Sequence, residues 1–173
     1  MADSARDRVR AGVVQGALLG LACYVSFLLA TQLVSRVHSI SATDDQVGGL
    51  WAVIATIFVC RGSYAKSFAA GVSRLAGTLV SFAICLVYLS FLPYHAWALA
   101  LLIGASVLVM IIVGRPDDAA TAAITTAVLI ALAKVTPQHA WQQPILRLAD
   151  TVIGVIVGVA AAWLVRAVHR TGS

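Results

Sequence analysis

A short motif that occurs twice limits the fold of this chain more than any other feature. Arg74-Leu-Ala-Gly-Thr78 recurs as Arg147-Leu-Ala-Asp-Thr151, at an offset of 147 − 74 = 73 residues. The same offset superimposes the acidic pair Asp44-Asp45 on Asp117-Asp118. In both copies an apolar segment and a polar turn separate the acidic pair from the motif, and a further apolar segment follows it. This order at a fixed offset indicates two similar halves.

The composition places both halves in a membrane. Of the residues, 61% are hydrophobic and 11% are charged, whereas soluble domains carry about 25% charged residues. Six apolar segments are expected to be helices, at about 11–34, 47–60, 74–92, 96–114, 119–133 and 144–168. The connection 61–73 is expected to lie at the membrane surface. The sequence therefore predicts an all-α integral membrane protein, with residues 1–173 as a single transmembrane domain of six helices.

The repeat also predicts how the halves are oriented. Each copy holds three helices, with repeat one at about 11–92 and repeat two at about 93–168. Because three crossings are an odd number, the second copy must be inverted in the membrane relative to the first. Inverted repeats are typical of alternating-access transporters, in which paired short segments mark the substrate path. The second and fifth helices are the expected short pair.

The basic residues predict the topology. With the N-terminus inside, nine Lys and Arg residues fall on the inner side and three on the outer side. This asymmetry favours cytoplasmic N- and C-termini. The net charge of +5 is spread over helix ends, so nucleic-acid binding is not expected.

The two motif arginines are candidate anion-binding residues. Arg147 is followed three positions later by Asp150, which lies on the same helical face and can partly neutralise it. Arg74 lacks this partner because Gly77 occupies the matching position. The functional interpretation is that Arg74 and Arg147 attract an organic anion. The alternative is that they extend to the membrane interface and anchor helix ends.

The remaining candidates follow from their positions near these arginines. Thr78 and Thr151, one turn further along, offer hydroxyl groups, and Trp51 in the short second helix offers a ring for stacking. The acidic residues are candidates for gating or proton coupling, with helix capping as the alternative; they are Asp44, Asp45, Asp117, Asp118 and Asp150.

Glycines four residues apart mark two helix faces, at Gly12, Gly16 and Gly20 and at Gly154 and Gly158. Such faces allow close helix packing. The cysteines and histidines are isolated, so no metal or cofactor is expected. Motifs of intramembrane or hydrolytic enzymes, such as HExxH or GxSxG, are absent from the sequence, and an enzyme is not expected.

The chain resembles the fusaric acid resistance and aromatic acid exporter family. The resemblance rests on Gly-Leu-Trp51-Ala-Val, on Ser63-Tyr followed by Arg74-Leu-Ala-Gly-Thr78, and on Arg147-Leu-Ala-Asp-Thr151-Val-Ile-Gly. Plant aluminium-activated malate channels are similar in outline. The resemblance implies export of aromatic carboxylates or related weak acids. The favoured interpretation is a bacterial inner-membrane exporter of small organic anions, driven by a proton gradient or the membrane potential.

The resemblance also implies partners. A periplasmic adaptor subunit often accompanies family members, and a single module of this size is expected to form a homodimer. Two other functions stay open at this point. One is a passive organic-anion channel, and the other is a non-transporting membrane subunit of a larger efflux complex.

Overall fold

The computed structural model describes residues 2–34, 42–61, 63–135 and 137–171. These residues form six α-helices and no strands, which confirms the predicted all-α class. The helices are α1 (Ala2–Leu29), α3 (Ala42–Val59), α4 (Tyr64–Phe91), α5 (Ala96–Ile112), α6 (Ala119–Val135) and α7 (Gln143–Thr171). Three short helical segments accompany them: the π-helical η1 (Ala30–Val34), which follows α1 directly, and the 3-10 turns η2 (Pro116–Asp118) and η3 (Pro137–Gln142).

Four of the described segments are long and apolar enough to cross a membrane: Gly12–Leu33, Tyr64–Phe91, Pro116–Val135 and Ala140–Ala167. Two shorter apolar helices are Asp45–Val59 and Ala96–Ile112. The second and fifth helices were the expected short pair. The structure confirms the second helix, α3, but the other short apolar helix is the fourth, α5, and not the fifth, α6. The reason is Pro116, which begins a 3-10 turn that continues into α6 rather than interrupting it.

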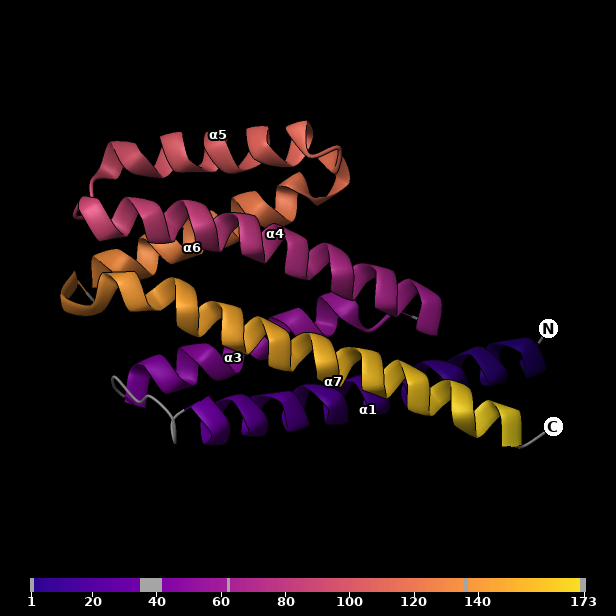
Figure 1. The fold of residues 1–173 in the computed structure, drawn as a ribbon. Coiled ribbons are helices and arrows are strands. Elements are labelled where there is room, and N and C mark those ends of the chain that lie inside the picture. The colour runs from indigo at the N-terminus through magenta and orange to yellow at the C-terminus, as the bar shows by residue number, and fades with distance from the viewer. Residues whose placement is uncertain (1, 35–41, 62, 136, 172–173) are drawn as a thin grey trace.

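Two long helices, α4 and α7, run side by side through the middle of the molecule (Figure 1). Helix α3 of the first half packs on α7 of the second half, and α6 packs on α4. Helices α1 and α5 then cover α3 and α6 from the outside. The two chain termini lie at the same end of the bundle (Figure 1).

Helix α4 begins earlier than the sequence suggests. Ser63 caps its first turn, and the Ser67 hydroxyl donates to the carbonyl oxygen of Arg61 at 2.8 Å while it accepts from the Arg61 N–H at 2.9 Å. The expected surface connection at 61–73 is thus wrong for most of its length. Arg74 lies 74 − 64 = 10 residues, or ~15 Å, inside the helix rather than at its start.

The two glycine faces have different environments. A Cβ atom at Gly154 would overlap the carbonyl oxygen of Ala52, and one at Gly158 would lie 2.9 Å from a Val59 methyl carbon. This face therefore brings the backbones of α7 and α3 together. By contrast, nothing in the described chain lies within 4 Å of a Cβ added at Gly12, Gly16 or Gly20. The face on α1 is open.

Gly154→Ala should lower the melting temperature in detergent, because the added methyl group forces α3 and α7 apart. Overpacking of a close contact costs about 1–3 kcal/mol. Gly104→Ala in α5 is the matched control, since nothing lies within 4 Å of its added Cβ. It should leave the melting temperature unchanged or raise it, because alanine favours a helix by up to about 1 kcal/mol. Equal melting temperatures for both variants would contradict the α3–α7 contact.

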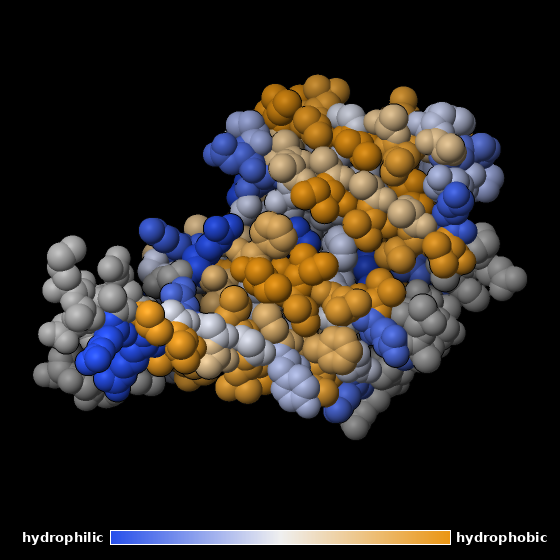
Figure 2. Space-filling model, turned by 180° about the vertical axis from the view of Figure 1, so that it is seen from behind, coloured by the Kyte–Doolittle hydropathy of each residue, from blue (hydrophilic) through white to orange (hydrophobic). Residues whose placement is uncertain are grey.

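The surface fits a hydrocarbon environment. Large apolar side chains such as Leu21, Leu101, Ile112 and Trp163 are exposed. Apolar side chains cover much of the face seen in Figure 2, and hydrophilic ones gather toward its edges. Together with the apolar spans, this surface identifies a multi-pass membrane protein.

Candidate functional site

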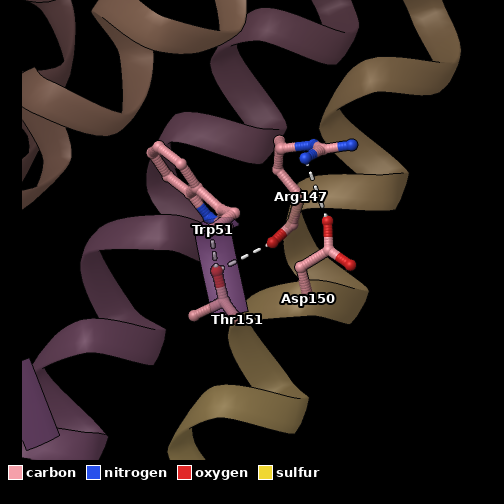
Figure 3. A network of polar contacts seen from close by, with 4 residues as sticks. All are labelled: Trp51, Arg147, Asp150 and Thr151. Carbon is pink, nitrogen blue, oxygen red and sulfur yellow. Dashed lines mark hydrogen bonds and ion pairs between the residues drawn. The ribbon is translucent and has the colours of Figure 1, made fainter. Parts of the chain in front are cut away.

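A polar network joins the two halves of the chain inside the bundle (Figure 3). The indole Nε1 of Trp51 on α3 donates a hydrogen bond to Oγ1 of Thr151 on α7 at 3.0 Å. The Thr151 hydroxyl in turn donates to the backbone oxygen of Arg147 at 2.7 Å. Both side chains are buried. The structure therefore brings together two residues that the sequence singled out separately.

The Trp51 ring also contacts Arg74. The guanidinium carbon of Arg74 lies 5.4 Å from the Trp51 ring centroid and 5.0 Å from that of Phe58. Both rings project from α3, seven residues and about two turns apart, so that they share one face. Arg74 is only 3% exposed, and its Nε and Nη2 atoms have no hydrogen-bond partner among the described residues. Two aromatic rings, rather than a carboxylate, thus surround this cation.

Arg147 has a different environment. Its Nη1 atom lies 3.2 Å from Oδ2 of Asp150, and both side chains are almost completely buried. The predicted pairing of these two residues is confirmed. Arg74 and Arg147 are both buried in the bundle.

The difference between the two arginines follows from the residue three positions later. A Cβ at Gly77 would lie 2.9 Å from the Thr121 methyl carbon, so α6 fills the space that a carboxylate would need. At the matching position of α7, Asp150 faces Gly48, where an added Cβ would lie 2.9 Å from Oδ2. Gly48 makes room for the Asp150 carboxylate, and Thr121 excludes one beside Arg74.

Thr78 lies one turn beyond Arg74 and is 1% exposed. Its hydroxyl has no hydrogen-bond partner in the described part of the chain, so the structure does not connect it to the Trp51–Thr151 hydrogen bond. It does place an unsatisfied hydroxyl on the helix that carries Arg74. Such groups are uncommon in protein interiors and call for an explanation.

The members of the two acidic pairs have different environments. Asp118 is buried, accepts a hydrogen bond from Ser73 and pairs with Arg115, whose Nε lies 2.6 Å from Oδ2. Asp117 is exposed at the same turn, and Asp45 is half-buried near the start of α3. The side chain of Asp44 lies outside the described residues. Asp118 is thus directly beside the helix turn that carries Arg74.

Sequence reasoning missed Phe58, Ser73 and Arg115. Phe58 could have been found from its spacing of two turns from Trp51. Arg115 could have been found from its spacing of three residues from Asp118. Ser73 gives no comparable signal, because its role depends on the contact between α4 and η2.

Comparison with known proteins identifies the family of the chain. Residues 21–161 match the family described as fusaric acid resistance protein-like. No curated protein and no solved structure matches the chain. Since the match spans most of the chain and includes every residue of the polar network, this membrane protein belongs to the fusaric acid resistance protein-like family.

Proposed function

We propose that this protein exports small organic anions, aromatic carboxylates in particular, from the cytoplasm across the bacterial inner membrane. The substrate carboxylate binds Arg74, and its aromatic ring lies against Trp51 or Phe58. Thr78 donates a hydrogen bond to the anion, while Arg147 and Thr151 shape the other wall of the site. The acidic residues around this site, above all Asp118 and Asp150, gate it or couple it to protons. No catalytic step, metal or cofactor is part of this function.

The single observation that supports this proposal best is the buried guanidinium of Arg74, which has no carboxylate partner among the residues that the structure describes. A charge at the bilayer centre costs about 2.5–3.5 kcal/mol on insertion scales. Two cation–π contacts return about 0.5–2 kcal/mol each. The Nε and Nη2 donors nevertheless find no acceptor in the described part of the chain. A carboxylate can accept from both donors of an arginine at once, which makes it the matching ligand.

The burial of Arg74 favours a transporter over an open channel. A substrate reaches this side chain only when helices of the bundle separate, as alternating access requires. Two contacts support the inverted repeat that such a mechanism uses. Gly48 meets Asp150, and Gly77 meets Thr121. The 73-residue offset of the repeat relates Gly48 to Thr121 (48 + 73 = 121) and Gly77 to Asp150 (77 + 73 = 150). The two contacts therefore join equivalent positions of the two halves, as an inverted repeat requires.

In the proposed topology all six helices cross the membrane and both termini are cytoplasmic. The shared position of the termini (Figure 1) and the nine-to-three distribution of basic residues support it. The open Gly12, Gly16 and Gly20 face of α1 is the proposed contact of a homodimer. A periplasmic adaptor would extend the path beyond the membrane.

The test is the flux of labelled p-hydroxybenzoate, benzoate and malate into proteoliposomes that contain the purified protein. An imposed pH gradient and an imposed membrane potential are applied separately, and liposomes without protein are the control. Saturable, protein-dependent uptake of the aromatic acids that follows the pH gradient would support the exporter. Uptake that follows the membrane potential without saturating would replace it with a passive channel. No uptake by correctly inserted protein would favour a non-transporting subunit.

A further inference from the structure

An apolar groove runs along the surface between α4 and α7, and no residue of the polar network is among its lining residues. Its volume is about 430 Å³, and its walls include Tyr64, Phe68 and Leu75 from α4 and Val155, Val159 and Trp163 from α7. Tyr64 and Leu75 are 75 − 64 = 11 residues, or ~16 Å, apart along the helix. That length is about half of the ~30 Å hydrocarbon core of a bilayer. The groove therefore extends over roughly one leaflet.

One end of the groove has the features of a membrane interface. Tyr64 and Trp163 line this end, and such amphipathic rings prefer the level of the lipid headgroups. The guanidinium carbon of Arg166 lies 5.9 Å from the Tyr64 ring centroid. Arg166 is exposed, so its N–H groups can still donate hydrogen bonds to an anion.

Negative charge is absent from the two segments that form this end. The sequence has no Asp or Glu between residues 46 and 116 and none after residue 150. Arg61 and Lys66 lie at the start of α4, and both are exposed. An apolar groove one leaflet long that ends in aromatic rings and several basic side chains matches a phospholipid with an anionic headgroup.

We propose that the α4–α7 groove binds an anionic phospholipid, with an acyl chain along the groove and the phosphate at Arg166. The helices that line the groove are α4 and α7, which also carry Arg74, Arg147 and Asp150. A lipid in this position would press on the outside of the same helix pair whose inner face holds the polar network. The proposal does not depend on the identity of the transported anion.

The test uses Trp163, which is 56% exposed, as a fluorescent reporter. The protein is reconstituted into vesicles of dibrominated phosphatidylcholine, whose bromine atoms quench nearby tryptophan. Increasing fractions of unbrominated phosphatidylglycerol are then mixed in. The Trp163 signal is the difference between the protein and its Trp163→Phe variant. Preferential binding should restore this signal at about a fivefold lower phosphatidylglycerol fraction than random mixing predicts.

Arg166→Gln should remove the preference and leave quenching by phosphatidylcholine intact, because the acyl chain still fits the groove. Lys134→Gln, which removes a charge from the last turn of α6, should keep the preference. The proposal would be overturned if Trp163 fluorescence in the unsubstituted protein recovered only in proportion to the mole fraction of phosphatidylglycerol. So would a Trp163 signal that brominated lipid does not quench, since this would mean that a second copy of the chain covers the groove.

Discussion

Arg74→Met should strongly reduce transport of aromatic carboxylates without unfolding the protein. A hydrogen bond to a charged group contributes about 1.5–3 kcal/mol, so the loss of the guanidinium should weaken substrate binding about 10- to 100-fold. The same change removes a buried cation whose Nε and Nη2 have no partner in the described structure. Replacing such a charge by an apolar side chain of similar length is often neutral or stabilising. The melting temperature should therefore stay the same or rise.

This combination separates binding from structure. A residue that only supports the fold lowers stability and transport together when it is removed. Arg74→Lys keeps the charge but loses the two-pronged geometry, so we expect partial recovery of transport. Lys134→Met is the matched control, because it removes an exposed cation that stacks on Tyr94 rather than one inside the bundle. If Arg74→Met transported as well as Lys134→Met, Arg74 would not be the anion site.

Asp150→Asn should strongly destabilise the protein. It removes the carboxylate charge that lies 3.2 Å from the buried Arg147 cation. Breaking a buried pair from one side costs about 3–5 kcal/mol. The melting temperature in detergent should fall clearly, and Arg147→Met should lower it as well, because the Asp150 carboxylate then has no cation beside it.

The double variant Arg147→Met with Asp150→Leu should regain most of the lost stability, since both charges disappear together. Its transport decides what the pair does. Uptake that still follows the pH gradient would assign the pair a structural role, whereas uptake that has lost this dependence would assign Asp150 to proton coupling. Unchanged stability in Asp150→Asn alone would contradict the burial of the pair.

Much of the site could be predicted from local sequence. Trp51, Arg74, Arg147, Asp150 and Thr151 all lie in the interior network or beside it. A charged residue inside an apolar helix is rare enough to indicate function by itself. The spacing of Arg147 and Asp150 also predicted their contact, because residues three apart share a helical face.

Other parts of the site could not be predicted in this way. The sequence alone suggested that Arg74 begins its helix, whereas the Ser63 cap and the Ser67 hydrogen bonds start α4 ten residues earlier (74 − 64 = 10). Such a cap competes with the apparent break at the polar residues 61–66, and only the folded turn shows which one prevails. The result moves Arg74 from an expected surface position to the protein interior.

The sequence by itself determined the membrane environment, the number of helices and the family. The membrane environment and the helix number depend on the length of apolar runs and on the placement of charges, and the family depends on short motifs; all of these are local properties of the chain. Only the tertiary structure decided that Trp51 bonds to Thr151, 100 positions away, and that aromatic rings rather than an acid surround Arg74. Such contacts depend on how α3, α4, α6 and α7 pack, because Gly48 admits a carboxylate on one side of the bundle and Thr121 excludes it on the other.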